Sequence, residues 1–234
     1  MTFTTSEVIY TLITARSVPI LIPYLIIVLL ARPLTQLFNP FSLRTPLLLH
    51  NILCVLLSTY TAVQGIRGIM DSPGIYHTAK GSPLLRHAFL VYWISKIIEL
   101  MDTMFMILRH KIKQMSFLHV FHHASILILA DNGYFLVPWP PIGLLMMLNS
   151  IVHIFMYTYY GLRAVQPLNE ISWKRRITQL QMAQFMFGLV FCFIGYLYHD
   201  FCVYSMLYGG GLLILFSNYY YHAFIRKKSV EKQK

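Results

Sequence analysis

Seven long apolar stretches restrict what this chain of 234 residues can fold into. An α-helix needs about 20 apolar residues to cross the hydrocarbon core of a bilayer, and each stretch approaches that length. The pattern predicts an all-α, polytopic membrane protein with seven transmembrane helices. Pro19 and Pro23 in the first stretch indicate a bent or peripheral helix. The expected spans lie near residues 17–32, 46–66, 84–109, 116–136, 141–163, 177–198 and 201–225.

The composition agrees with a bilayer as the surrounding solvent. Hydrophobic residues make up 57% of the chain and charged residues only 12%, about half the share found in soluble domains. A soluble domain of this size lacks the interior to hide so many apolar side chains, because its surface needs polar cover. No linker or low-complexity stretch divides the sequence. We therefore expect one membrane domain over residues 1–234, with a polar tail from about residue 226.

Lysine and arginine residues are concentrated in three groups, and the net charge is +11. The groups lie at 109–113, 174–176 and 226–234, in the loops or tail after odd-numbered spans. Because basic loops face the cytoplasm, the C-terminus is predicted to be cytoplasmic and the N-terminus to lie on the opposite side. Lys80 and Arg86, together with Arg67, depart from this pattern. The basic groups flank apolar spans instead of forming one soluble patch, so we expect no nucleic-acid binding.

Four polar side chains lie within the third expected span, where ionisable groups are costly. Lys96, Glu99 and Thr103 share one face of a helix with about 3.6 residues per turn, and Asp102 lies beside them. Lys96 and Glu99, at positions i and i+3, can neutralise each other. A structural ion pair between helices and a functional site explain this group equally well.

Three histidines open the fourth expected span. His119, His122 and His123 occupy positions i, i+3 and i+4, which places three imidazoles on one side of a helix. A single intramembrane histidine is often a hydrogen-bonded core residue, but three on one face are hard to explain by packing. The cluster suits metal ligation by neutral imidazole, or nucleophilic and acid–base chemistry near neutral pH.

Polar residues also follow one face of the fifth span and open the sixth. His153 can reach the histidines of the fourth span if the two helices pack antiparallel across a short turn. The glutamines of the sixth span need hydrogen-bond partners in lipid, either on another helix or in a site. These residues are Asn149, His153, Tyr157 and Tyr160 in the fifth span, and Gln181 and Gln184 in the sixth.

Taken in order, these motifs closely resemble those of the ELO family of very-long-chain fatty acid elongases. One HxxHH motif alone is a weak signal, but four ordered motifs on four expected helices are a strong one. The segment from Gln114 to His123 is similar to the branch that acts on polyunsaturated or very-long-chain acyl groups. The four motifs are Lys96-x-x-Glu99-x-x-Asp102-Thr103, His119-x-x-His122-His123, Asn149-x-x-x-His153-x-x-Met156-Tyr157-x-Tyr159-Tyr160 and Thr178-x-x-Gln181-x-x-Gln184-Phe185.

The resemblance implies an acyltransferase, a 3-oxoacyl-CoA synthase of the endoplasmic reticulum membrane. Such enzymes condense a long-chain acyl-CoA with malonyl-CoA and release CoA and carbon dioxide. The resemblance also implies six helices around an acyl tunnel with the first helix peripheral, a lumenal N-terminus, and no bound cofactor or metal. The expected partners are both CoA substrates, membrane lipids, and the reductases and dehydratase of the elongation cycle. Homo-oligomer formation is left open.

Residue chemistry assigns expected roles within this reaction. None of the three cysteines, Cys54, Cys192 and Cys202, lies near the motifs in the sequence, so we expect no thiol nucleophile. Imidazole attacks thioesters, and His122, central in the cluster, is the expected acyl acceptor. We expect the enolate or oxyanion to be held by His119, His123, His153, Asn149 and Gln181, and imidazoles to be oriented by Glu99 and Asp102. Expected substrate contacts are Lys96, Thr103, Tyr157, Tyr160, Gln181, Gln184, Lys174, Arg175 and Arg176, the last three toward CoA phosphates.

Two other classes of protein are compatible with parts of the pattern. A membrane di-iron desaturase or hydroxylase also uses HxxHH boxes, but it needs several, and the remaining histidines here form no second one. A non-catalytic seven-span receptor or transporter explains the topology. It does not explain why Lys96, His122 and His153 are expected at a similar depth.

Overall fold

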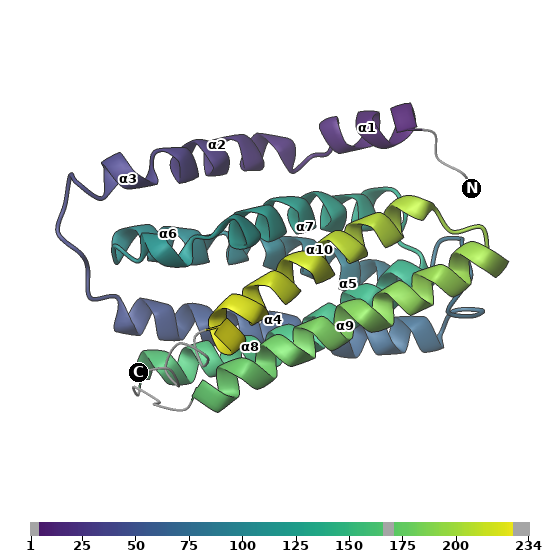
Figure 1. The fold of residues 1–234 in the computed structure, drawn as a ribbon. Coiled ribbons are helices and arrows are strands. Elements are labelled where there is room, and N and C mark those ends of the chain that lie inside the picture. Colours follow the sequence, from purple (N-terminus) through teal and green to yellow (C-terminus); the bar gives the residue numbers. More distant parts are fainter. Residues whose placement is uncertain (1–4, 166–170, 227–234) are drawn as a thin grey trace. The chain divides into compact units, whose positions relative to one another are not determined.

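The computed structural model describes residues 5–165 and 171–226, and the elements within these ranges are helical (Figure 1). The predicted all-α class is confirmed. The lysines expected in the polar tail after Arg226 lie outside the described residues. In chain order the elements are α1 (Thr5–Ile13), α2 (Val18–Leu29), α3 (Ala31–Leu34), α4 (Arg44–Met70), α5 (Pro83–Glu99), α6 (Met101–Leu108), η1 (Ile112–Gln114), α7 (Phe117–Phe135), α8 (Pro140–Val165), α9 (Ile171–Tyr198), α10 (Val203–Tyr220) and the π-helical η2 (Tyr221–Arg226).

The helices form two compact units. The first contains α1 to α8, and the second contains α9, α10 and η2. The expectation of one domain over the whole chain stays a prediction.

Within the described ranges, three helices are long and apolar enough to cross a bilayer: α4, α8 and residues 173–198 of α9. The apolar helix α2 is shorter. Each of the other expected spans coincides with described helices, since α5 and α6 cover the third, α7 the fourth, and α10 with η2 the seventh. A membrane protein with several apolar helices is therefore established. The count of seven spans and the acyl tunnel stay predictions.

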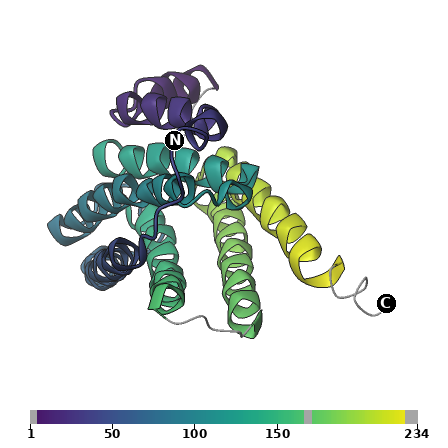
Figure 2. The same cartoon turned by 90° about the vertical axis from the view of Figure 1, so that its left-hand side faces the viewer.

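Helix α5 is central to the first unit, because it packs against α4, α7 and α8 (Figure 2). Leu85 on α5 is completely buried. Glycines on two neighbours allow this close packing, since an added Cβ would lie 2.6 Å from the Leu85 backbone at Gly68 of α4 and 2.7 Å from the Leu85 side chain at Gly143 of α8. Small residues of this kind let helix backbones approach closely where lipid provides no hydrophobic driving force.

The third expected span is interrupted at Leu100, between α5 and α6. The Leu100 N–H bonds the carbonyl of Ile97, and the Thr103 N–H bonds the carbonyl of Leu100, at 3.2 and 3.1 Å. Both bonds join residues three apart, which is the tighter pattern of a 3₁₀ turn. The interruption changes the helical register between Glu99 and Asp102. Glu99 is the last residue of α5, and Asp102 lies in the first turn of α6.

The first apolar helix lies along one side of the unit. Pro19 is in the first turn of α2, where its missing N–H costs little, and Pro23 lies inside the helix. Tyr24 is only 3% exposed and packs in a cluster with Leu100 and Leu127. Helix α2 therefore presents one side to α6 and α7. Figure 1 shows α1 to α3 following one another along this side.

Candidate active site

A buried ion pair lies at the centre of the first unit. Lys96 Nζ donates to Glu99 Oε1 at 2.6 Å, and both side chains are at most 1% exposed. The predicted neutralisation at i and i+3 is confirmed. Lys96 Nζ also lies 4.6 Å from the centre of the Tyr92 ring. Removing one partner of such a pair leaves a buried charge uncompensated, so the two side chains depend on each other.

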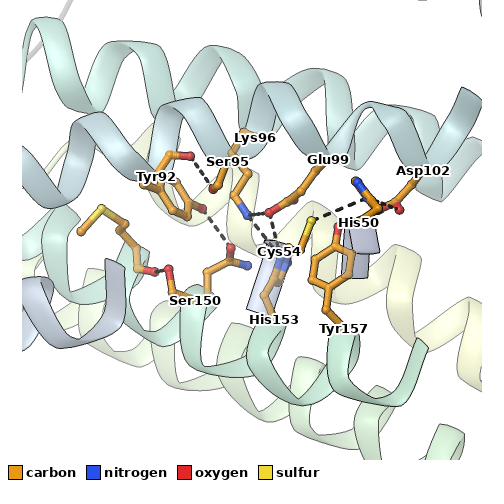
Figure 3. Close-up of polar contacts among 12 residues, drawn as sticks. His50, Cys54, Tyr92, Ser95, Lys96, Glu99, Asp102, Ser150, His153 and Tyr157 are labelled. Atoms are coloured by element: carbon orange, nitrogen blue, oxygen red, sulfur yellow. Dashed lines mark hydrogen bonds and ion pairs between the residues drawn. The ribbon is translucent and has the colours of Figure 1, made fainter. Parts of the chain in front are cut away.

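His153 of α8 joins this pair (Figure 3). Its Nδ1 lies 3.2 Å from Lys96 Nζ and 3.2 Å from Glu99 Oε1. A single ring nitrogen either accepts from the ammonium or donates to the carboxylate, so its two neighbours determine the tautomer of the ring. Glu99 is therefore in contact with an imidazole, as its expected orienting role requires. The role itself stays a prediction.

Asp102 meets a histidine that sequence reasoning did not select. His50 Nε2 of α4 lies 3.0 Å from Asp102 Oδ1, and the Tyr157 hydroxyl donates to Asp102 Oδ2 at 2.7 Å. We expected Asp102 to orient an imidazole of the motifs, and the imidazole it contacts is that of His50. The available signal was a histidine inside an apolar span, where ionisable side chains are rare.

Cys54 corrects the expectation that the cysteines are remote from the motif residues. The α4 helix places Cys54 Sγ 3.6 Å from His50 Nε2, within the same group of polar side chains (Figure 3). A carboxylate accepts hydrogen bonds only, so His50 Nε2 carries the proton that it shares with Asp102. That nitrogen has no lone pair left to take a proton from the thiol. Cys54 is therefore not arranged as a nucleophile with His50 as its base.

The three histidines of α7 lie together, as their spacing predicts. The rings of His119 and His123 are 4.4 Å apart, and those of His122 and His123 are 5.5 Å apart. His119 Nε2 lies 2.9 Å from Thr103 Oγ1, which in turn lies 3.2 Å from the Tyr24 hydroxyl. This chain of hydrogen bonds connects α7 to α6 and α2. Tyr24 is a second contact that the motifs did not indicate.

His153 approaches the α7 cluster, as anticipated for the fifth span. The ring centres of His122 and His153 are 6.2 Å apart. Helix α5 packs against both α7 and α8, so it holds the helices of these two histidines together. The four imidazoles thus lie in one continuous group beside the Lys96–Glu99 pair.

Two buried polar atoms of this group have no hydrogen-bond partner within the described residues. They are Glu99 Oε2 and His123 Nδ1. Buried polar atoms in proteins are nearly always paired, so unpaired ones indicate a place where a further polar group can bind. Both belong to residues that the sequence assigns to the site.

The remaining predicted residues of α8 occupy different positions. Asn149 is buried, and its Oδ1 accepts from the Tyr92 hydroxyl at 2.9 Å, which leaves its amide NH₂ as the group to offer to an oxyanion. Tyr157 is buried, and its ring packs edge-on 5.6 Å from the ring of His153. Tyr160 is 45% exposed and contacts the Tyr157 ring at its outer side. Its expected contact with substrate stays a prediction.

The predicted residues of α9 belong to the second unit. There Arg175 Nε donates to the Tyr220 hydroxyl at 2.7 Å, and Lys174 Nζ lies 5.6 Å from the centre of the Tyr219 ring. Both cations are exposed, as is Arg176. Gln181 and Gln184 are half-buried on the same helix. The expected contacts of these five residues with the substrates, including those of the three cations with CoA phosphates, stay predictions.

Comparison with known proteins identifies the family. The family described as "ELO: GNS1/SUR4 family" matches residues 14–232. The chain belongs to the ELO family. Very long chain fatty acid elongase 5 of Homo sapiens is 31% identical over 226 aligned residues, covering 90% of this chain and 74% of the human protein. Elongase 1 of Mus musculus is 33% identical over 216 aligned residues, covering 83% of this chain and 75% of the mouse protein.

A third relative, very long chain fatty acid elongase 7 of Rattus norvegicus, is 33% identical over 219 aligned residues, covering 83% of this chain and 75% of the rat protein. The resemblance inferred from the four motifs is thereby confirmed. In this ELO protein, three of the motifs lie in the first unit, and their histidines and carboxylates form one group of buried and half-buried side chains.

Proposed function

We propose that this chain is a very long chain fatty acid elongase, an acyltransferase that condenses an acyl-CoA with malonyl-CoA to form a 3-oxoacyl-CoA two carbons longer. Membership of the ELO family and the names of the related elongases support the activity. The assignment of the active site rests on the approach of His122 to His153 beside the buried Lys96–Glu99 pair. Both substrates are CoA thioesters, and no bound cofactor or metal is part of the proposal.

The first half of the reaction forms an acyl-imidazole on His122. The imidazole nitrogen attacks the thioester carbonyl carbon, the carbon–sulfur bond breaks, and CoA leaves with the proton that the ring gives up. Capturing the acyl group covalently divides one difficult step into two easier ones. His122 occupies the centre of the group, with His123 and His153 as ring neighbours at 5.5 and 6.2 Å. The oxyanion is held there by hydrogen-bond donors such as the Asn149 amide.

The second half consumes malonyl-CoA. Loss of carbon dioxide leaves a carbon nucleophile, which attacks the acyl carbonyl and breaks the carbon–nitrogen bond to His122. The ring recovers a proton from solvent, and 3-oxoacyl-CoA is released. Lys96 balances the Glu99 carboxylate, and the unpaired Oε2 of Glu99 and Nδ1 of His123 are the atoms available to meet polar groups of the substrates. His119 is held by its hydrogen bond with Thr103, and its ring packs against the ring of His123.

The setting of the reaction follows from family membership and topology. We place the enzyme in the endoplasmic reticulum membrane, with a lumenal N-terminus and a cytoplasmic C-terminus, as the distribution of basic residues predicts. The acyl chain lies in a tunnel between apolar helices, while Lys174, Arg175 and Arg176 attract CoA phosphates at the cytoplasmic side. The product is passed to the reductases and dehydratase of the elongation cycle.

A direct assay tests the proposed function. The purified protein in micelles, given a long-chain acyl-CoA and malonyl-CoA, is expected to release carbon dioxide and form a 3-oxoacyl-CoA, with neither product when the acyl-CoA is left out. A panel of acyl-CoAs then defines the preferred chain length and unsaturation. Absence of condensation across that panel, with a folded protein, would contradict the proposal.

A further inference from the structure

A cavity of about 230 Å³ lies at the end of the first unit opposite the start of α7. Lys80 and Gly81 precede α5, Pro83 and Arg86 lie in its first turn, and Tyr134 and Phe135 end α7. We call this cavity the end pocket. Along α7 it lies about 20 Å from His122, at about 1.5 Å per residue, so it is separate from the histidine group.

The end pocket is positively charged and aromatic. Lys80 and Arg86 line it, and the Arg86 guanidinium lies 5.8 Å from the centre of the Tyr134 ring. The Arg16 guanidinium lies 4.0 Å from the centre of the Phe135 ring. A guanidinium stacked on an aromatic face keeps the N–H groups at its edge free to bind an anion. The two arginines are therefore held in place by contacts that leave their donors available.

None of these three cations forms an ion pair with a carboxylate among the described residues. Asp131, one turn before Tyr134 on α7, is buried and accepts a hydrogen bond from the backbone N–H of Ser17 at 2.5 Å. The pocket also lies at the N-terminus of the 17-residue α5, whose dipole favours an anion there. No carboxylate of the described residues therefore pairs directly with these cations.

The position of the pocket indicates the source of that anion. Helices α5 and α7 have their boundary residues Pro83 and Phe135 at this level, where a spanning bundle meets the lipid headgroups. Leu84 and Leu136, the residues directly following Pro83 and Phe135, are 44% and 54% exposed. The cations of the end pocket therefore face the polar end of a ligand, and the exposed leucines lie beside these cations.

We propose that the end pocket binds the phosphate of an anionic phospholipid, with the acyl chains of that lipid lying along Leu84 and Leu136. The orientation given by the basic loops places this lipid in the leaflet away from the cytoplasm, and it accounts for Lys80 and Arg86 on that side. Two charge-assisted hydrogen bonds from the protein hold the phosphate, and the leucines distinguish a lipid from a free phosphate ion.

Native mass spectrometry of the full chain in micelles tests this proposal, with phosphatidic acid and phosphatidylcholine as alternative probes. We expect phosphatidic acid to bind in preference to phosphatidylcholine. The Lys80→Ala/Arg86→Ala double variant is expected to bind phosphatidic acid about tenfold more weakly, given the strength of hydrogen bonds to charged groups. The matched control is Lys111→Ala/Lys113→Ala, which removes two exposed cations, one directly before η1 and one within it. If both double variants weakened the binding of phosphatidic acid equally, net charge alone would explain the effect, and the proposal would be overturned.

Competition separates the possible anions. Inorganic phosphate or free CoA, each in excess, is expected to leave the bound phosphatidic acid in place, and displacement by either would show an ion or nucleotide site instead of a lipid site. Should the double variant fail to fold, the single change Lys80→Met in the loop before α5 replaces it. We expect this variant to bind phosphatidic acid about threefold more weakly. Unchanged binding of phosphatidic acid would contradict the proposal. None of these readouts depends on elongation activity.

Discussion

His50 Nε2 lies 3.0 Å from Asp102 Oδ1 and brings α4 into contact with a residue of the KxxExxDT motif. The same carboxylate accepts from the Tyr157 hydroxyl at 2.7 Å, and the Tyr157 ring packs against His153. Asp102 therefore fixes Tyr157, which in turn limits where the His153 ring can lie. His50 acts at the start of this sequence of contacts as a positioning residue, without being part of the histidine group.

Replacing His50 should reduce turnover more than substrate binding. His50→Phe keeps the ring volume but removes the hydrogen bond to Asp102, and we expect kcat to fall about tenfold with KM changed less than about twofold, since a lost bond of about 1.4 kcal/mol gives that factor. His50→Gln retains a donor and should recover part of kcat. Steady-state kinetics with purified variants measures both parameters. Equal losses in the two variants would show that the hydrogen bond is not what matters.

Cys54 should be dispensable for chemistry despite its place in the network. Its Sγ contacts a nitrogen whose proton is shared with Asp102, so it has no base. Cys54→Ala is expected to keep kcat within about threefold and to lose about 1 kcal/mol of stability from the small cavity left behind. The acyl-CoA assay and thermal unfolding in micelles measure these effects. A loss of activity of a hundredfold or more would restore the thiol as a candidate nucleophile.

Stability should depend on the pairing of Lys96 and Glu99 more than on their charges. Lys96→Met leaves the Glu99 carboxylate buried without its cation, and we expect a loss of about 3–5 kcal/mol in the free energy of unfolding. The double change Lys96→Met/Glu99→Gln removes both charges and should be less destabilising than Lys96→Met alone. Denaturant unfolding in mixed micelles compares the two. A double variant that loses as much stability as Lys96→Met alone, or more, would contradict coupling between the residues.

The close approach of α4 and α5 gives a prediction about packing. In Gly68→Ala the new Cβ would lie 2.6 Å from the Leu85 backbone, so the helices must separate. We expect a loss of about 1–3 kcal/mol, as for overpacking in other cores. The control is Gly211→Ala in α10, where an added Cβ meets nothing within 4 Å, and a helical Ala should be neutral or stabilising. Thermal unfolding distinguishes them, and similar results for both variants would contradict the role of Gly68.

Local geometry explains why parts of the site were predictable. Lys96 and Glu99 lie on one helix, as do the three histidines of α7, so residue spacing alone places their side chains together. The approach of His153 was also predicted, from direct packing of its helix on the fourth span, whereas α5 packs against both helices and holds them together. These predictions required only the helical period and the cost of polar groups in lipid.

Other features depend on contacts that spacing does not encode. His50 and Asp102 are 52 residues apart, so their meeting depends on how α4 packs against α5 and α6. The break at Leu100 between α5 and α6 has no proline or glycine to mark it. The Tyr24 contact likewise depends on where α2 lies against the bundle.

The proposed reaction depends most directly on His122, the residue that carries the acyl group. Intact mass of the protein after incubation with acyl-CoA alone should increase by one acyl group, with one equivalent of CoA released, and fragmentation should place the adduct on His122. His122→Ala should show neither the adduct nor CoA release while remaining folded. A wild-type protein that forms 3-oxoacyl-CoA when malonyl-CoA is present, yet shows no adduct and no CoA release from acyl-CoA alone, would contradict the acyl-imidazole route.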